Sequence, residues 1–214
     1  ASGLAATCSC AGVPLLNSMG TSFVNDNQWL LNVIYEHHSM NELYSGTKEV
    51  KDETQRTRET QSFILQLDYG INDTWSVSTM LSFVEHQRKI GKSNDQTTVS
   101  GLGDGLVLLK YSPRKINLLS RWEYSLGLGM KIPIGVDDAQ QNEITVAEDM
   151  QPSSGSYSTL AWAYWGYAFD QVAQKQVFIT SNYSVNQEND RGYAAGNELN
   201  VSAGFSYTMQ ENWG

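Results

Sequence analysis

The chain has 214 residues, of which 17% are charged and 11% are aromatic, and its formal net charge is −9. A chain of this length builds one sizeable domain, and an acidic balance without clusters of Lys and Arg excludes a nucleic-acid partner. Six Trp and eleven Tyr stand among many Ser, Gly, Asn, Gln and Thr residues. This mixture is typical of strands that are apolar on one face only.

Residues 1–26 carry no strand pattern, and we expect them to form an N-terminal periplasmic segment. The opening Ala1-Ser2-Gly3 resembles the end left after removal of an export signal. Cys8 and Cys10 form a Cys-x-Cys pair in this segment. Three interpretations remain open for the pair: an inert or disulfide-bonded pair, a soft-metal or redox site, and a point of attachment for lipid or a protein partner.

The first three strands show apolar residues at every second position, a period that indicates one apolar face. The pattern runs from Trp29 to Tyr35, from Phe63 to Tyr69 and from Trp75 to Phe83. The second and third of these segments are separated by Asn72-Asp73, a tight turn that predicts a hairpin.

Five further strands follow the same pattern, and the clearest alternates apolar and polar residues throughout Arg121–Ile132. The others are expected at Thr98–Tyr111, Tyr157–Phe169, Gln176–Val185 and Asn197–Tyr207. Eight strands with no helix between them predict an all-β fold, an antiparallel up-and-down transmembrane β-barrel over residues 27–214.

The links between strands alternate in length, as in outer-membrane barrels with short periplasmic turns and long outer loops. The short links are Asn72-Asp73, Ser112–Leu119 and Asp170–Lys175. The longer or more polar links are Asn41–Arg58, Arg88–Gln96, Pro133–Ser156 and Asn186–Gly196. The sequence therefore predicts the outer membrane of a Gram-negative bacterium.

The barrel is expected to be incomplete at the C-terminus. Met209–Gly214 repeats the character of Ile71–Ser76, a turn that leads into an outward Trp at the base of a strand. We therefore expect a parent barrel of ten to twelve strands, because an open sheet edge in lipid leaves its N–H and C=O groups without partners.

Successive side chains of a strand point to opposite faces, so odd and even positions can be assigned to the two faces of the wall; we call this assignment strand parity. The outward aromatics near the short links predict a membrane girdle of Trp29, Tyr69, Trp75, Tyr111, Trp122 and Tyr207. The charged residues expected to face the lumen are Glu36, Asp68, Asp104, Lys110, Glu123 and Lys131. The alternative is a soluble β-sandwich, but long strands and loops of unequal length at the two ends favour the barrel.

The segment from Gly101-Leu102-Gly103-Asp104 to Lys110-Tyr111 resembles a "GLGD…KY" strand found in outer-membrane proteins of the transporter and phenol-degradation meta-pathway type. The match covers about a dozen residues, and it implies a barrel that passes small, often aromatic or apolar, molecules. Strand parity places Gly101, Gly103 and Gly105 on one face, where a neighbour can approach closely, and Asp104 on the lumen face.

Enzymatic constellations are absent from the sequence, so we expect neither an enzyme nor a cofactor. The weak metal candidates are Cys8, Cys10, His38 and His86, with Glu42 as a candidate loop ligand. The alternation of side chains along a strand places both histidines in the lumen, about 10 Å apart because one strand lies between them. Solvated histidines at a pore mouth are the favoured interpretation. The acidic residues of the long loops are expected to be solvated surface, with weak divalent-cation binding beside lipopolysaccharide as the alternative.

Two functions from different classes follow. The first is a porin-like channel or transporter for small solutes, with apolar or aromatic molecules as the candidates. The second is a non-conducting structural or assembly barrel that presents the N-terminal cysteines or the outer loops to partners. Outer-membrane lipid, lipopolysaccharide and a small solute are the expected partners, with a protein partner at the N-terminus as a further possibility.

Overall fold

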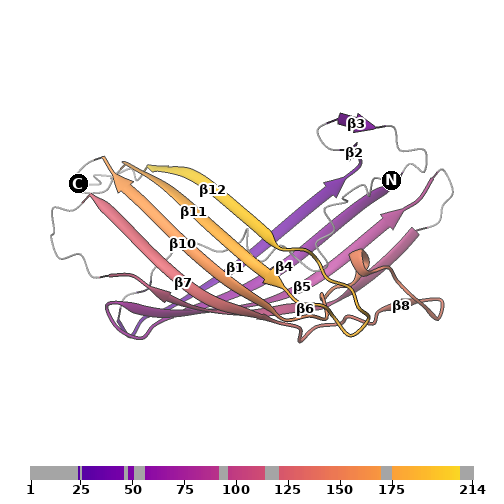
Figure 1. The fold of residues 1–214 in the computed structure, drawn as a ribbon, viewed down its shortest axis with the longest axis horizontal. Coiled ribbons are helices and arrows are strands. Elements are labelled where there is room, and N and C mark those ends of the chain that lie inside the picture. The colour runs from indigo at the N-terminus through magenta and orange to yellow at the C-terminus, as the bar shows by residue number, and fades with distance from the viewer. Residues whose placement is uncertain are drawn as a thin grey trace, which may run out of the picture.

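A computed structural model describes residues 24, 26–45, 48–50, 56–91, 96–113, 121–169 and 175–207. Eight long strands form one sheet in the order β1-β4-β5-β6-β7-β10-β11-β12, and every neighbouring pair is antiparallel. Their bounds are β1 Trp29–Met40, β4 Thr57–Gly70, β5 Trp75–Lys89, β6 Gln96–Tyr111, β7 Trp122–Ile132, β10 Ser158–Ala168, β11 Lys175–Asn186 and β12 Glu198–Tyr207. The sheet curls into an open trough, with β1 and β12 at its two edges (Figure 1).

The prediction of an all-β, up-and-down antiparallel fold is confirmed, and all eight strands lie where alternation placed them. Four short strands and one turn of 3-10 helix were not expected from the sequence. They are the hairpin β2 Leu43–Ser45 with β3 Lys48–Val50, the hairpin β8 Gln140–Gln141 with β9 Ile144–Thr145, and η1 Glu148–Met150. Within the described residues no helix is long and apolar enough to cross a membrane.

The links between the long strands gather at two ends of the sheet. Residues 71–74, 112–121 and 169–174 connect strands at one end, called here the short-link end. Residues 41–56, 90–95, 133–157 and 187–197 connect strands at the opposite, long-link end, although 90–95 is no longer than 169–174. Taken as two sets, the links at one end are therefore longer than those at the other, but not every long link is longer than every short one.

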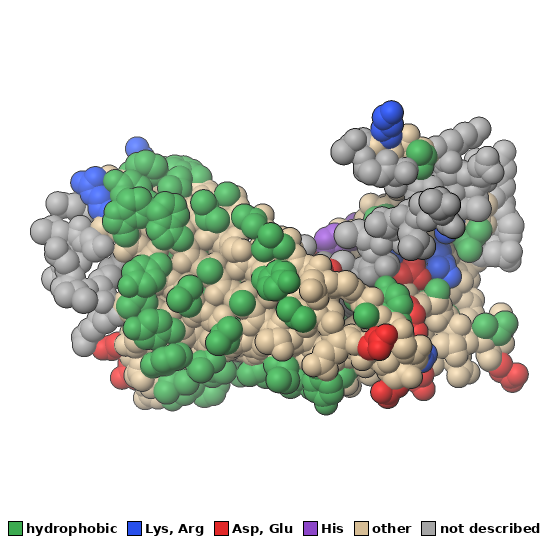
Figure 2. Space-filling view, in the orientation of Figure 1, with side chains coloured by type: hydrophobic (Ala, Val, Ile, Leu, Met, Phe, Trp, Pro, Cys, Tyr) green, Lys and Arg blue, Asp and Glu red, His purple; other side chains and the backbone are tan. Residues whose placement is uncertain are grey.

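The convex face of the sheet is apolar and exposed. Val33 and Leu128 are 71% and 70% exposed, and large aliphatic or aromatic side chains from every long strand join them. Figure 2 shows such side chains spread over the part of the wall formed by β7 and β10 to β12. Apolar area of this extent on a folded protein marks a surface that meets something other than water.

The concave face is not uniformly polar, which corrects the expectation of a polar interior. At mid-height it carries a buried apolar cluster, here called the inner belt. Its members are Ile64, Met80, Val84, Leu106, Leu108, Leu160, Trp162 and Tyr164, with Ile34 and Phe178 packed against them. Polar and charged side chains lie on either side of the inner belt, toward the two ends of the sheet.

A β-bulge in β6 shifts the face assignment of the glycine-rich segment. The register with β5 slips between Leu81 and Phe83, opposite Leu102 to Gly105. A Cβ on Gly101 would meet Val136 and Pro152, and one on Gly103 would meet Pro152. A Cβ on Gly105 would instead meet Ile134, which is exposed, and the outward side chain of Leu81. The expectation that the three glycines share one face is therefore wrong, because a bulge inserts a residue and exchanges the two faces beyond it.

The long segment 133–157 folds against the concave face instead of standing in solvent. Val136 donates its N–H to the carbonyl oxygen of Leu102 at 2.9 Å, and Ser153 donates its N–H to the carbonyl oxygen of Val136 at 2.9 Å. Met150 and Gln151 are completely buried. We call residues 133–157 the inner loop.

Candidate functional site

A buried charge cluster lies on the concave face near the short-link end, between β4, β5 and β6. Lys110 donates from Nζ to Oδ1 of Asp68 at 3.4 Å, and the ammonium also lies 5.3 Å from the ring centroid of Trp162. Gln66 donates to Oδ2 of Asp68 at 2.7 Å, and the Ser78 hydroxyl donates to Oδ1. Strand parity places all of these groups on the inner face, so the cluster neutralises two charges that burial would otherwise penalise.

A second cluster joins β6 and β7 to the inner loop. The carboxylate of Asp104 accepts from the hydroxyl of Ser153 and from the N–H and hydroxyl of Ser154. Lys131 lies 3.2 Å from Oδ2 of Asp104 and donates to the Ser154 hydroxyl at 2.8 Å. A carboxylate with several donors holds these donors in place, so Asp104 fixes the inner loop to the wall.

A third group of charges lies at the long-link end. Nη1 of Arg88 is 3.5 Å from Oδ1 of Asp149, and Nη1 of Arg58 is 3.7 Å from Oδ2 of the same carboxylate. The hydroxyl of Thr60 and Nδ1 of His86 are 2.9 Å apart beside them. Arg58 and Arg88 come from β4 and β5, while Asp149 comes from η1, so these ion pairs also join the inner loop to the wall.

The inner loop is also tied to residues 187–197. Arg191 donates from Nη2 to Oε2 of Glu148 at 2.9 Å, and its Nη1 lies 3.7 Å from Oδ2 of Asp137. Asn189 donates to the same Glu148 oxygen at 3.1 Å. The hydrogen bond from Arg191 lowers the pKa of Glu148 despite partial desolvation, and the same bond raises the pKa of Arg191.

The acidic inner loop is therefore more than solvated surface. Asp137, Glu148 and Asp149 are each paired with an arginine of another segment. The expectation of a free acidic loop is wrong for these three because the sequence does not show which arginines approach a loop that folds inward. Asp138 and Glu143 stay in the same loop, where Glu143 is exposed.

The structure places the six charged residues that were expected in the lumen on the concave side of the sheet. It joins Asp68 to Lys110 and Asp104 to Lys131. Glu123 accepts from Nε2 of Gln176 at 3.3 Å, and Glu36 lies 3.4 Å from Nε2 of His38. The pairing of acids with bases across strands could not be read from the sequence because it depends on the register of the sheet.

Sequence reasoning missed the serines of the inner loop and the arginines that meet it. Ser153 and Ser154 belong to a run of small residues that was interpreted as an ordinary loop. Ile64 on β4 and Val84 on β5 point inward. Counting every second residue from Ile64 back to Arg58, and from Val84 forward to Arg88, would have placed both arginines on the inner face. Arg191 lies outside the long strands and gives no such signal.

The histidines are separated as strand parity predicts, but the expectation of solvated histidines is wrong for His86, which is completely buried. Thr60 is opposite both His38 on β1 and His86 on β5, so one strand lies between the two imidazoles. Among the described residues no three His, Cys, Asp or Glu side chains come together in a way that could hold a metal ion. Cys8 and Cys10 lie outside the described residues.

The aromatic residues expected in the girdle lie near the short-link end, on the outer face. Trp29 and Tyr69 have ring centroids 4.3 Å apart, and those of Trp75 and Tyr111 are 4.9 Å apart. Trp122 stacks on Trp165 at 4.8 Å. Nζ of Lys175 lies 5.8 Å from the ring centroid of Tyr207, the sixth residue of the set.

Comparison with known proteins gives a likeness to a solved structure. No family model matches the chain, and no curated protein matches it. Among solved structures, the chain is similar to an outer membrane channel from Pseudomonas putida F1, with a TM-score of 0.59 and 13% sequence identity. The match covers 85% of this chain and 66% of the channel, so the chain spans about two thirds of the channel's length. At this identity the likeness shows a shared fold, and in this chain that fold is a curled antiparallel sheet.

Proposed function

We propose that the chain forms the greater part of the wall of an outer membrane channel for small solutes in a Gram-negative bacterium, and that it has no enzymatic activity. One observation carries this proposal. The same sheet is apolar and exposed on its convex face, while its concave face holds buried ion pairs such as Asp68–Lys110. Lipid on one side and a solute path on the other account for both faces.

Further observations support a membrane wall. The long strands reach 10 to 16 residues, against about 9–11 for a tilted membrane crossing and a mode of about 5–6 in globular proteins. The outer face also has an apolar groove of about 590 Å³ whose lining includes Ala161, Ala163 and Leu126. The groove fits a lipid acyl chain, and the aromatic residues at the short-link end fit the headgroup zone.

The inner loop favours a second candidate function, a barrel that does not conduct. It covers part of the concave face and is fixed there by Asp104, Arg58 and Arg88. In this alternative the wall is a scaffold that presents its outer loops, or the N-terminal cysteines, to partners. The two functions differ in one measurable property, the passage of solute.

Reconstitution into a planar lipid bilayer tests the proposal. The protein is extracted from outer membranes in detergent, and its heat-dependent migration on a gel is used to confirm a folded barrel. We expect discrete conductance steps and solute-driven swelling of liposomes. A folded, correctly inserted protein that gives neither signal would contradict the channel and favour the scaffold.

A further inference from the structure

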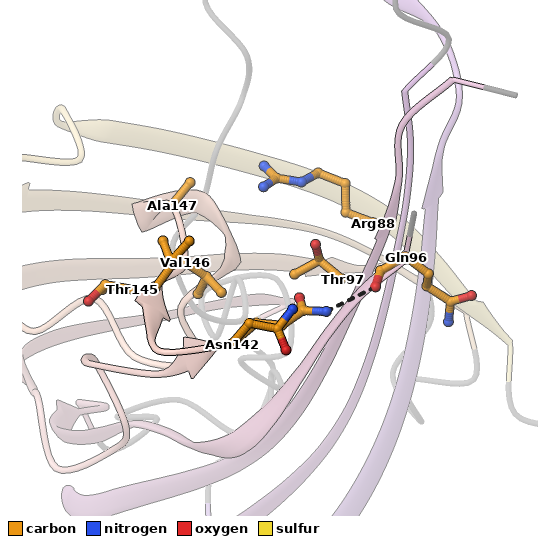
Figure 3. A pocket seen from close by; sticks show the side chains of 9 residues that line it. Arg88, Gln96, Thr97, Asn142, Thr145, Val146 and Ala147 are labelled. Carbon is orange, nitrogen blue, oxygen red and sulfur yellow. Dashed lines mark hydrogen bonds between the residues drawn. The ribbon is translucent and has the colours of Figure 1, made fainter. Parts of the chain in front are cut away.

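A cavity of about 490 Å³ lies on the concave side at the long-link end, between the wall and the inner loop. Arg88 of β5 and Gln96 and Thr97 of β6 form its wall side. The β8–β9 hairpin and the residues after it form the other side, with Gln141, Asn142, Ile144, Thr145, Val146 and Ala147. Its size is within the range of small-molecule sites, about 300–1,000 Å³. Figure 3 shows the Arg88 side chain extending from the wall toward Val146 and Ala147.

The charge of the cavity comes from Arg88. Of the described residues that line it, Arg88 alone is charged. Nε of Arg88 is buried and has no hydrogen-bond acceptor among the described residues. Its Nη1 lies 3.5 Å from Asp149, a carboxylate that Arg58 approaches as well. Asp149 thus lies between the guanidinium groups of Arg88 and Arg58, while Nε of Arg88 keeps a donor for a further anion.

The other lining groups suit the rest of a small organic molecule. Thr97 is opposite Arg88 in the register, and its hydroxyl, with the amides of Gln141 and Asn142, supplies neutral hydrogen-bonding groups. Ile144 is 72% exposed although it lines a cavity, so an apolar ligand surface could cover it. Guanidinium groups bind carboxylates through paired N–H donors, and Asp149 demonstrates this chemistry at Arg88.

We propose that this cavity binds a small organic monocarboxylate with an apolar or aromatic body, and that Arg88 is the residue that recognises the carboxylate. Asp149 is the internal competitor, since it occupies the same guanidinium when the cavity holds no anion. The proposal rests on the proposed function for the route by which solute reaches the cavity. Binding itself is measured without transport.

Benzoate is the probe, and benzamide is its uncharged counterpart of similar shape. Binding to the folded protein in detergent is followed by titration calorimetry at low ionic strength. We expect saturable binding of benzoate and at least 10-fold weaker binding of benzamide, because charge-assisted hydrogen bonds are about twice as strong as neutral ones. Equal affinity for the two probes would overturn the proposal.

Two substitutions and a control locate the site. Arg88→Gln should weaken benzoate binding about 10-fold or more and leave benzamide unaffected. Lys89→Gln makes the same charge change at the next residue, which is exposed on the other face of β5, and should change neither. Asp149→Asn should strengthen benzoate binding by removing the competitor, an effect that a merely structural role of Arg88 does not predict.

The outcomes separate this proposal from the channel itself. Benzoate binding that is unchanged in Arg88→Gln, or weakened in Asp149→Asn, would overturn the carboxylate site even if the protein conducts. Tighter binding of inorganic phosphate than of benzoate would also overturn it. Arg88-dependent benzoate binding without any conductance would support the site and contradict the channel.

Discussion

At the scale of single residues, strand parity assigns each side chain to lipid or to the lumen, and neighbouring positions on β12 test the assignment. Val201 is 60% exposed on the outer face, and the next residue, Ser202, is exposed on the inner face. Val201→Lys should lower the stability of the inserted protein by about 2–4 kcal/mol if it lies at mid-bilayer, and Ser202→Lys should cost little. Urea unfolding in lipid vesicles measures both; the opposite ranking would mean that the faces are reversed.

The buried pair of Lys110 and Asp68 predicts a different residue-scale effect. Lys110→Met leaves the Asp68 carboxylate buried without its cation, and removal of one partner of a buried pair costs about 3–5 kcal/mol. The double variant Lys110→Met with Asp68→Asn should recover most of this loss, because no uncompensated charge remains. The stabilities of both variants come from the same unfolding assay. A double variant as unstable as the single one would show that the loss does not come from an uncompensated Asp68 charge.

At the scale of elements, the docking of the inner loop depends on close backbone approach at Gly135. A Cβ at this position would overlap the carbonyl oxygens of Leu102 and Gly103, which belong to the wall and cannot rotate away. Gly135→Ala should therefore detach the start of the inner loop from β6 and speed hydrogen exchange in residues 133–157. Gly101→Ala is the control, since its Cβ would lie 3.0 Å from the Cγ2 of Val136, a side-chain atom that can move. Equal exchange in the two variants would contradict this role of Gly135.

The link between the inner loop and residues 187–197 predicts a dependence on pH. The pKa of Glu148 is lowered in the docked state by the hydrogen bond from Arg191, so ionisation of Glu148 favours docking. This contribution is complete above the ordinary pKa of a glutamate, about 4.3, and is lost as the pH falls through the lowered value. Below this range the protection of the amides around Glu148 against hydrogen exchange, relative to the intrinsic rate at each pH, should fall. Arg191→Gln should remove most of the dependence, and an unchanged profile in that variant would exclude Arg191 as its cause.

The elements also show what a sequence reveals and what it hides. Alternation with a period of two located every long strand, because each outer face carries the same apolar period. The inner belt was missed, although Ile34 and Ile64 stand at inward positions; the residues two positions before and after each of them, on the same face, are polar. The bulge in β6 and the inward course of 133–157 leave no periodic signal. They depend on contacts between segments far apart in the chain, such as Ser153 with Asp104.

At the scale of the whole molecule, the wall has two edges that need partners. In the described part of the chain, β1 pairs with β4 and β12 pairs with β11, and no pairing joins β1 to β12. Unpaired N–H and C=O groups in the bilayer core cost several kcal/mol each, so strands at both edges must be covered in the membrane. Closure by the two edges themselves would make an eight-stranded barrel whose interior is just filled by side chains.

We predict instead that β1 and β12 do not pair with each other in the membrane, because they lie at opposite edges of an open trough. Disulfide trapping tests this in native outer membranes, with Cys8→Ser and Cys10→Ser as the background. Cysteines at Leu31 and Val201 should fail to form a cross-link, because strands that are not neighbours lie well beyond the 4.4–6.8 Å Cα separation of disulfides. Cysteines at Leu31 and Leu67, which are paired in the register of β1 with β4, provide the positive control.

Because the register across a β1–β12 closure is not known in advance, the scan also moves the second cysteine to Leu199, Ala203 and Phe205, the other outward positions of β12. Efficient cross-linking at any of these positions would show that the barrel closes at eight strands, and a filled interior would then favour the scaffold over the channel.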